Sequence, residues 1–450
     1  FAAICEAAGI AFVGPASSVI ARMGDKTQAR DAMKAAGVPV TPGSAGNLAN
    51  VEEALSVAEQ VGYPVMLKAT SGGGGRGIRR CDDAHQLEQA WGRVISEATK
   101  AFGSADVFLE RCVVDPLHIE VQILADNHDN VIHLFERDSS IQRRNQKLIE
   151  IAPSPQLTPE QRSYVGEMAV RAARAVGYRN AGTVEFLVKG NEIYFMEMNT
   201  RVQVEHTISE AITGVDIVRE QIRIAWGHKL AFRQEDIRHH GYAIQFRINA
   251  EDPKNDFLPS FGRITRYYAP GGPGVRTDTA IYTGYTIPPY FDSMCLKLIV
   301  WGLTWEEVIN RGSRALNDMR LQGVKTTAPY YQEILKHPDF RNAHFDTGFV
   351  AAHPELTQYS VKRLPEQTAL AIAAAIAAHA ASSVSLDAEE ADVKAAATEM
   401  DGALASLQKW RAGREADRKA LERKLEAEYS PPKLALDLDR TALAARTFCG

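Results

Sequence analysis

Two glutamates, Glu185 and Glu197, lie in a stretch whose alternating apolar residues predict a β-hairpin over 183–199. If residues 190–192 form a three-residue loop, the two carboxylates face each other on one side of the ladder. Facing carboxylates repel by about 0.2–1 kcal/mol on an exposed sheet and by more when buried, which favours a bound cation. Hard oxygen ligands suit Mg²⁺, which would also bridge to phosphates. A two-residue loop would instead put the glutamates on opposite faces and remove this argument.

Polar residues continue at alternate positions beyond the hairpin, at Glu197, Asn199, Arg201, Gln203 and Glu205. If the chain stays extended, all five line one face, and Arg201 to Glu205 spans ~13 Å at ~3.3 Å per residue. That length fits a small anion beside the end of a triphosphate. A guanidinium can hold a planar oxyanion through two hydrogen bonds, and a nearby carboxylate can accept its proton. The alternative is an amphipathic edge strand with a solvated face.

A glycine-rich stretch, SGGGGRG over Ser71–Gly77, follows Lys68 and precedes a predicted short strand, Ile78–Cys81. A dinucleotide site would need a helix directly after the glycines, and a Walker A loop would close on G-K-[ST], so neither is predicted. Glycine N–H groups folded over a nucleotide's phosphates, with Lys68 as a point charge, fit the pattern better. A flexible turn is the alternative.

Both helices and strands must position these residues. From Ala29 to Leu67 helices alternate with a loop and an apolar strand, which is typical of an α/β fold. Further strands are predicted at Val107–Glu110, Ile119–Leu124 and Val131–Glu136. Helices are predicted at Val51–Val61, Ala84–Ala101, Pro159–Val176, Gly214–Ala225 and Trp305–Asp318. The opening residues predict the end of a helix, a stop at Gly9 and a short strand.

The composition narrows the class of protein. At about 150 residues per domain, 450 residues predict roughly three domains. A formal charge of −5 leaves no basic surplus for binding nucleic acid. The five cysteines are odd in number and widely spaced, and no secretory signal opens the chain, so a cytoplasmic protein with reduced thiols is expected. Ala369–Ala381 is shorter than the ~20 residues of a membrane span and predicts a soluble helix.

Six motifs occur in order: MGDK, KATSGGGGRG, ERDSSIQRRNQK, EMNTRVQVEH, FRINAEDP and PPYFDSM. Together they resemble the biotin carboxylases, which are ATP-grasp enzymes, over about residues 1 to 350. The sequence between the motifs is most similar to the biotin carboxylase subunit of two-subunit pyruvate carboxylases. The resemblance implies an α/β (α+β) ATP-grasp fold with a glycine-rich lid and a mainly β C-terminal domain. The family's HPGYGFLSEN segment has no counterpart in this sequence.

The resemblance also implies a domain division. Residues 1–24 would be the remnant of a truncated N-terminal α/β domain, and residues 25–240 the ATP-grasp domain with a lid at about 41–112. Residues 241–350 would form the biotin carboxylase C-terminal domain. Residues 351–450, rich in alanine and charge, would form a helical tail of unknown role.

Residues that match the family motifs take roles by resemblance. Those expected to bind ATP are Lys26, Lys68, Gly73, Gly74, Gly75, Glu110, His118, Gln142 and Asn145. At the last of these positions the family usually has His, although Asn can still donate and accept hydrogen bonds. The expected ligands of Mg²⁺ or Mn²⁺ are Glu185, Glu197 and Asn199.

The resemblance implies four catalytic residues. Lys147 and Arg201 would clamp bicarbonate, Glu205 would remove its proton, and Arg247 would stabilise the biotin enolate. Bicarbonate would attack the γ-phosphorus of ATP to give carboxyphosphate, whose phosphate would deprotonate biotin. The expected partners are a second copy of this chain as a homodimer, a biotinyl carrier domain and a carboxyltransferase subunit, without nucleic acid or membrane.

Two other functions remain open at this point. The chain could be the biotin carboxylase component of an acetyl-CoA or propionyl-CoA carboxylase, because the final acceptor binds elsewhere and leaves no site here. It could also be a nucleotide-binding scaffold without catalysis, because the first segment of the family pattern is missing.

Overall fold

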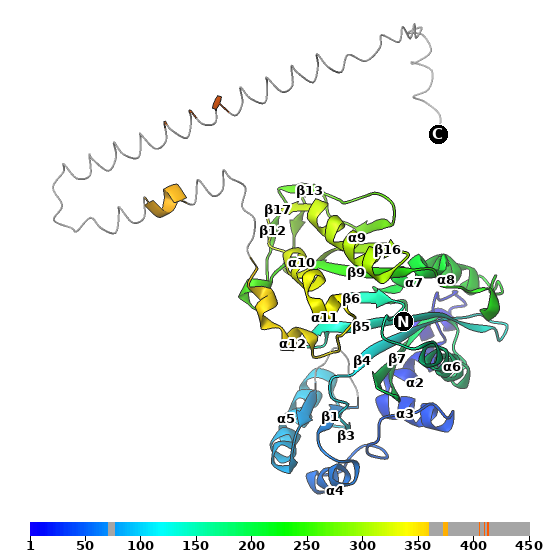
Figure 1. Ribbon diagram of the computed structural model, residues 1–450. Coiled ribbons are helices and arrows are strands. Elements are labelled where there is room, and N and C mark those ends of the chain that lie inside the picture. Colours follow the sequence, from blue (N-terminus) through cyan, green and yellow to red (C-terminus); the bar gives the residue numbers. More distant parts are fainter. Residues whose placement is uncertain (71–76, 360–371, 377–404, 406–408, 410–411, 414–450) are drawn as a thin grey trace, which may run out of the picture. The chain divides into compact units, whose positions relative to one another are not determined.

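The computed structural model describes residues 1–70, 77–359, 372–376, 405, 409 and 412–413 (Figure 1). Contacts divide the chain into two units, Phe1–Tyr359 and Ser360–Gly450, and the fold below is that of the first. The predicted glycine flap with Gly73, Gly74 and Gly75 lies outside the described residues, as does most of the predicted tail. Within Ala369–Ala381, only the helical residues 372–376 are described.

An antiparallel sheet of eight strands forms the centre of the unit, in the order β14-β16-β9-β6-β5-β4-β7-β8 (Figure 1). The strands are β4 (Leu117–Ala125), β5 (Val131–Arg143), β6 (Gln146–Ala152), β7 (Asn180–Lys189), β8 (Glu192–Asn199), β9 (Tyr242–Asn249), β14 (Val275–Thr279) and β16 (Met294–Gly302). β5 continues past its predicted end at Glu136, so the basic motif IQRRNQK forms the β5–β6 turn. Neighbouring strands β6 and β9 pair from Ile149 with Phe246 to Ala152 with Ala243.

Helices pack on this sheet through apolar faces. α6 (Pro159–Ala175) begins at a capping box between Thr158 and Gln161, as its sequence predicts. Its buried side chains, Val165 among them, pack against β4 and β7. Each fully buried aliphatic side chain contributes about 1.5–3 kcal/mol. At the other end of the sheet, α9 (Trp305–Asp318) and α10 (Ala328–Lys336) pack on β9 and β16 (Figure 1).

Two helices follow the β7–β8 hairpin, α7 (His206–Thr213) and α8 (Ile217–Ala225). The sequence predicts the second but not the first, because α7 is short and its start is not marked by a capping hydrogen bond. The residue before α7, Glu205, has φ −85° and ψ 5°. This helix therefore fixes where Glu205 lies.

The predicted lid is a separate small layer. Its three strands, in the order β2-β1-β3, are β1 (Val65–Ala69), β2 (Ile78–Cys81) and β3 (Val107–Arg111). α4 (Val51–Val61) and α5 (Ala84–Phe102) cover them around a core that includes Leu67 and Leu109. β1 carries Lys68 and β3 carries Glu110.

The chain opens with α1 (Ala2–Ala7), α2 (Ser17–Gly24) and α3 (Lys26–Ala35). The short strand predicted after Gly9 does not form, so that prediction is wrong. Asp25 caps α3 by accepting a hydrogen bond from the Gln28 N–H. Lys26 consequently lies in the first turn of a helix that packs against β8.

The remaining elements are short. They are η1 (Gln234–Asp236), β10 (Glu251–Asp252), η2 (Pro253–Asn255), β11 (Leu258–Pro259), β12 (Gly262–Arg263), β13 (Arg266–Tyr268), β15 (Thr286–Ile287), β17 (Arg320–Gln322), α11 (Pro338–Arg341), α12 (Phe349–Ala352) and η3 (Pro354–Thr357). They agree with the mainly β region that the sequence predicts after α8. Among the described helices, none combines the length and apolar character that a bilayer crossing requires.

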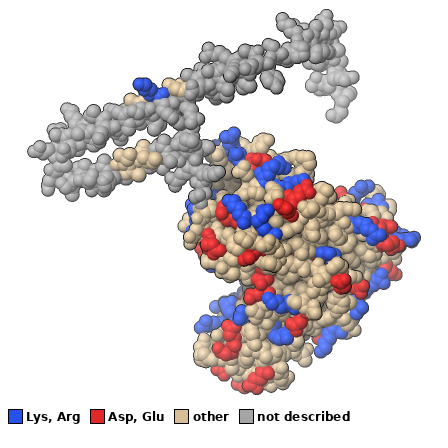
Figure 2. All heavy atoms as spheres, viewed as in Figure 1, with Lys and Arg blue, Asp and Glu red and all other residues tan. Residues whose placement is uncertain are grey.

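Charged side chains of both signs are interspersed on the face of the unit shown in Figure 2. This distribution agrees with the formal charge of −5.

Candidate active site

The β7–β8 hairpin places Glu185 opposite Glu197, as predicted, but by a different route. Its loop has only two residues, 190–191, so the predicted three-residue loop is wrong. A β-bulge at Met196 adds one residue to β8 and shifts the register by one beyond it. The bulge therefore restores the facing carboxylates that a regular two-residue hairpin would have separated.

Glu185 lies at the centre of a buried polar network and is 2% exposed. Its Oε2 is 2.7 Å from Nε2 of His118. Its Oε1 accepts hydrogen bonds from Nδ2 of Asn199 at 2.8 Å and from Nε2 of Gln203 at 2.8 Å. The Lys147 ammonium lies 3.2 Å from the same oxygen. This carboxylate is thus satisfied from four different segments of the chain.

Lys147, on β6, contacts three buried carboxylates. Besides Glu185, it forms an ion pair with Glu120 and lies 2.7 Å from Oε1 of Glu205. The other oxygen of Glu205 lies 3.1 Å from Nη2 of Arg247 on β9. Glu205 is therefore held between two cations that come from neighbouring strands.

The predicted extended face does not continue to Glu205, because β8 ends at Asn199. A turn and α7 instead return Gln203 and Glu205 to the site, where both are buried. Arg201 lies on the outside of this turn, is exposed, and contacts Asn199 Oδ1 at 3.4 Å. The prediction of five side chains on one extended face is wrong, because the chain turns after Asn199 and leaves Arg201 exposed while Gln203 and Glu205 are buried.

A further ion pair lies behind Glu205. Nε of Arg247 is 2.5 Å from Oε1 of Glu150 on β6, and that carboxylate is completely buried. Gln245 donates to the other oxygen of Glu150 at 2.9 Å. Glu150 thus holds the Nε side of the Arg247 guanidinium, and Nη2 of the same group contacts Glu205.

Sequence reasoning missed several buried members of this site, Glu120 and Arg137 above all. Arg137 is fully buried and lies 3.3 Å from Oε2 of Glu120. It also donates to Gln203 Oε1 at 2.6 Å, which orients that amide toward Glu185. A signal for Glu120 was present, because His118 and Glu120 alternate with apolar residues along LHIEVQILA and so share one face of β4.

We call this group the acidic cluster. Its carboxylates and its cations are Glu120, Glu150, Glu185, Glu197, Glu205, Arg137, Lys147 and Arg247. The carboxylates outnumber the permanent cations, so the cluster has a surplus of negative charge.

A second group, the basic cluster, has the opposite balance. Glu110 forms an ion pair with Lys68 and lies 2.7 Å from Nη1 of Arg30. Lys26 belongs to the same group, because burial and the nearby charge of Lys68 lower its pKa. Two cations here contact one carboxylate, and the charge of Lys26 adds to them. Glu110, predicted to contact ribose or adenine, thus lies between two positively charged side chains.

Lys26 connects the two clusters. Its pKa is also influenced, in the upward direction, by Glu197 and Glu110. A cavity of about 230 Å³ lies at this junction and is lined by Lys26, Glu197, Asn199 and Arg201 with their neighbours. The structure therefore brings three predicted ligands and the exposed arginine to one opening.

The other predicted nucleotide residues lie along β4 and the β5–β6 turn. His118 contacts Glu185, as described above. Gln142 is half-buried at the end of β5, where its backbone pairs with Lys147. Asn145 is exposed and has φ +63°, a conformation that Asn adopts more readily than most residues.

The charge states follow from burial and neighbours. Burial opposes ionisation of Glu185, but Lys147 and His118 outweigh that cost and hold its pKa well below the ordinary value. Burial opposes the charge of Lys147, yet Glu120 and the other carboxylates raise its pKa above the usual range. Burial raises the pKa of Glu197, Glu185 raises it further, and Lys26 offsets only part.

These residues fit a divalent cation. Glu185 and Glu197 offer oxygens on one face, and the Asn199 amide reaches both, at 2.8 Å and 3.3 Å. Burial and the neighbouring Glu185 raise the pKa of Glu197, which indicates that positive charge is lacking on the Glu197 side of the pair. A hard divalent ion would supply it. A related grouping, His118, Glu120 and Glu185, has ligand atoms within 4.8 Å of one another.

Cys295 does not have the surroundings of a thiol nucleophile. Cys295 is buried, and that burial raises the pKa of its thiol to about 12. The thiolate needed for nucleophilic attack is therefore scarce near neutral pH.

Comparison with known proteins agrees with this geometry. Residues 25–233 match the family model described as carbamoyl-phosphate synthase L chain, ATP binding domain, and residues 245–352 match the biotin carboxylase C-terminal domain. The 2-oxoglutarate carboxylase small subunit of Hydrogenobacter thermophilus is 53% identical over 381 residues, covering 84% of this chain and 80% of that protein. A pyruvate carboxylase subunit of Methanothermobacter thermautotrophicus is 51% identical, covering 77% and 70% respectively.

Solved structures give the same result. The biotin carboxylase domain dimer of the H. thermophilus 2-oxoglutarate carboxylase, in complex with MgADP, ADP and bicarbonate, has a TM-score of 0.78 and 53% identity, covering 80% of each chain. The biotin carboxylase subunit of a pyruvate carboxylase has a TM-score of 0.68 and 52% identity, with the same coverage.

The sheet, the lid and the two charged clusters thus define an ATP-grasp enzyme. The chain belongs to the biotin carboxylase family, and it is an ATP-dependent ligase that carboxylates biotin.

Proposed function

We propose that the chain carboxylates biotin on a carrier domain with ATP and bicarbonate, and that the acidic cluster performs the proton transfer. The observation that carries this proposal is the position of Glu205 between Lys147 and Arg247, at 2.7 Å and 3.1 Å. A carboxylate placed between two cations lies where they can also hold bicarbonate, so it is positioned to accept the bicarbonate proton. The H. thermophilus relative, crystallised with MgADP and bicarbonate, supports the same substrates here.

Two cations at Glu205 also suit the charge that develops in the reaction. Once Glu205 takes the proton, Lys147 and Arg247 are left facing the anionic substrate. Lys147 would hold bicarbonate, together with Arg201 if that exposed side chain turns into the cavity it lines. The deprotonated bicarbonate attacks the γ-phosphorus to give carboxyphosphate and ADP.

Mg²⁺ would be held by Glu185 and Glu197 with Asn199. When bound, it neutralises charge on the phosphates that face the acidic cluster. On the opposite side Lys26 and Lys68 supply positive charge to the nucleotide. His118, Gln142 and Asn145 would complete the nucleotide site with Glu110 and the glycines 73–75.

Arg247 would act again in the second half-reaction. Carboxyphosphate breaks down to CO₂ and phosphate, and the phosphate removes the proton of the biotin ureido nitrogen. Arg247 would stabilise the resulting enolate, because Glu150 fixes its guanidinium at 2.5 Å and leaves one nitrogen edge for an oxyanion.

The final acceptor is proposed to be a 2-oxo acid. Two relatives about half identical to this chain support it, one from a pyruvate carboxylase and one from a 2-oxoglutarate carboxylase. The partners would be a carboxyltransferase subunit, a biotinyl carrier domain and a second copy of the chain, as in the relative's domain dimer. An acyl-CoA carboxylase remains the alternative, since relatives named simply as biotin carboxylases are similarly close. We expect the complex in the cytoplasm.

The domain roles follow the two matched regions. Residues 25–240, including the lid at 41–112, would bind ATP, and residues 241–350 would supply Arg247. Residues 1–24 and 351–450 are left without a catalytic role.

The test is ATP hydrolysis by the purified full chain with bicarbonate, with and without free biotin. We expect phosphate release to depend on bicarbonate and to rise with biotin. ATP hydrolysis at a rate that does not depend on bicarbonate would contradict the proposal. The absence of ATP hydrolysis by folded protein would contradict it as well. The acceptor is tested by adding the co-purifying partner and comparing pyruvate, 2-oxoglutarate and acetyl-CoA as acceptors of labelled carbon dioxide.

A further inference from the structure

Two histidines and two carboxylates gather away from the active site, around the short elements α11, α12 and η3. His337 precedes α11, His353 follows α12, and Glu355 lies in η3. Asp339, in α11, completes the group. The ligand atoms of the two histidines and Glu355 all lie within 4.8 Å of one another. None of these four residues takes part in the reaction proposed above.

The two imidazole rings lie against each other, with a carboxylate at each end. Their centroids are 4.1 Å apart. At one end, Oε1 of Glu355 is 3.0 Å from Nδ1 of His353 and 3.8 Å from Nε2 of His337. At the other end, Oδ2 of Asp339 is 3.4 Å from Nε2 of His353 and 3.8 Å from Nδ1 of His337. Each ring thus presents one nitrogen to Glu355 and the other to Asp339.

Packing holds the rings in this arrangement. The buried Phe349 contacts both, with centroids 5.7 Å from His337 and 4.7 Å from His353. The histidine side chains are 18% and 20% exposed, so they are mostly fixed, whereas Glu355 is 55% exposed and free to adjust. Rigid nitrogen ligands with an adjustable carboxylate are suited to receiving an ion.

We propose that His337, His353 and Glu355 bind a divalent transition-metal ion, Zn²⁺, at the Glu355 end of the ring pair. Tetrahedral zinc with bonds of about 2.0–2.1 Å separates neighbouring ligand atoms by about 3.4 Å. The two separations from Oε1 of Glu355, 3.0 Å to His353 and 3.8 Å to His337, lie on either side of that value. Two imidazoles and one carboxylate are a ligand set that zinc uses, with the fourth position left to water.

Asp339 then has a defined part as the outer carboxylate. With the metal on one nitrogen of each ring, the other nitrogens carry hydrogen and both face Asp339 Oδ2. This is the carboxylate–histidine–metal arrangement that orients ligands and raises their basicity. Its formation would replace one long hydrogen bond, 3.3 Å from the Asp339 N–H to Nδ1 of His337.

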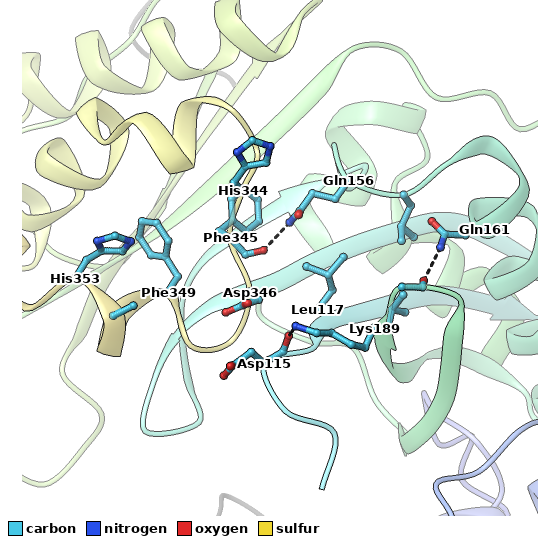
Figure 3. Close-up of a pocket in the computed structure, with 14 residues that line it drawn as sticks. Asp115, Leu117, Gln156, Gln161, Lys189, His344, Phe345, Asp346, Phe349 and His353 are labelled. Atoms are coloured by element: carbon cyan, nitrogen blue, oxygen red, sulfur yellow. Dashed lines mark hydrogen bonds between the residues drawn. The ribbon is translucent and has the colours of Figure 1, made fainter.

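Glu355 is 55% exposed, so the fourth position at its end of the ring pair has access to solvent. His353 is among the residues that line a cavity of about 580 Å³ between the C-terminal helices and the strands β4 and β7 (Figure 3). His344 and Asp346 also line it, Asp115 lies next to Asp346, and Lys189 donates a hydrogen bond to the backbone carbonyl of Asp115 (Figure 3). The ion would join α11 to η3 and so fasten the C-terminal end of this unit.

The test is zinc binding by the full chain after removal of metal with a chelator, in excess Mg²⁺ to occupy the carboxylates of the active site. We expect one equivalent of zinc for the wild type by calorimetry. His353→Ala should lose that equivalent, and Glu355→Gln should weaken it at least tenfold. Asp339→Asn should weaken binding by about 10–100-fold.

His344→Ala is the matched control, because it removes a histidine from the same cavity outside the proposed ligand set. It should bind zinc like the wild type. Zinc should also raise the unfolding temperature of the wild type by about 3 °C and leave that of His353→Ala unchanged. If His353→Ala does not fold, His353→Gln and the exposed Glu355→Gln replace it. Equal zinc stoichiometry and affinity in the wild type and these variants would overturn the proposal.

Discussion

The acidic and basic clusters differ in how charge is balanced. In the acidic cluster five carboxylates surround three permanent cations, and most of these groups are buried, on β4, β5, β6 and β7 and directly before α7. In the basic cluster Arg30 and Lys68 contact Glu110, Lys26 adds a third positive charge, and the Lys68 side chain is 15% exposed. The acidic cluster therefore has uncompensated negative charge that can bind a metal ion. The basic cluster has uncompensated positive charge that can bind phosphates.

The comparison shows how one cleft can bind a metal and a polyanion together. A cluster with equal numbers of positive and negative groups would bind neither the metal ion nor the polyanion strongly, because its charges would already be paired. Here each cluster has an excess of one sign, and its ligand carries the opposite charge. Glu197 of the acidic cluster and Glu110 of the basic cluster both act to raise the pKa of Lys26. This lysine therefore lies where the metal ion and the polyanion would meet.

The largest expected effect is on catalysis, where a change in the acidic cluster should matter more than the matched change in the basic cluster. Glu205→Gln keeps the shape but cannot accept a proton, so bicarbonate-dependent turnover should fall by about 10²–10⁴-fold. ATP affinity, measured by calorimetry, should change little. The matched change Glu110→Gln, in the basic cluster, should keep the reaction and mainly alter the KM for ATP. Turnover of the Glu205 variant within tenfold of wild type would show that this residue is not the base.

The second prediction concerns stability. Glu120→Gln leaves Lys147 and Arg137 buried with less compensation, so the free energy of unfolding should drop by about 3–5 kcal/mol. Glu110→Gln should lower it by only about 1–2 kcal/mol, because the hydrogen bonds lost there are closer to water. Urea unfolding of both variants gives the comparison. Equal losses would mean that the two environments are alike.

The third prediction separates the ligands. Glu197→Gln should weaken Mg²⁺ binding by about tenfold or more, while metal-free ADP binds as before. Lys68→Gln should do the reverse, weakening ADP by a similar factor and sparing Mg²⁺. Titration calorimetry with each ligand alone measures both. Loss of the two affinities together in either variant would indicate a single coupled cluster.

The smallest expected effect is on pH dependence. Because burial and Glu185 raise the pKa of Glu197, protons compete with Mg²⁺ at higher pH than at an ordinary glutamate. Lowering the pH from about 8 to about 6 should weaken Mg²⁺ binding roughly threefold. Glu197→Gln should show a flatter dependence. A pH dependence of Mg²⁺ binding that is steeper in the Glu197 variant than in the wild type would show that protonation of Glu197 is not its cause.

Much of the fold follows from local sequence. The capping box at Thr158 marks the start of α6, and the range predicted for the helix after Thr304 is that of α9. Such signals need only neighbours in sequence. The strand predicted after Gly9 failed because its apolar residues meet no partner strand among the described residues.

The site was harder to predict, because it depends on register and on turns. The facing pair of Glu185 and Glu197 depends on a bulge that no loop length reveals. Alternation after Asn199 suggested an extended chain, whereas a turn into α7 moves Arg201 outward. Arg137 contacts residues from three other elements, so its role is visible only when those elements are assembled.

The pairing of β6 with β9 has a practical consequence for anyone who wishes to dissect the enzyme. Separate family models match either side of residue 240, yet hydrogen bonds from Ile149–Ala152 to Ala243–Phe246 join the two sides in one sheet. A fragment cut between them would expose two long unpaired edges, which invite aggregation. The two halves are therefore best purified, crystallised and exchanged between homologues as one piece.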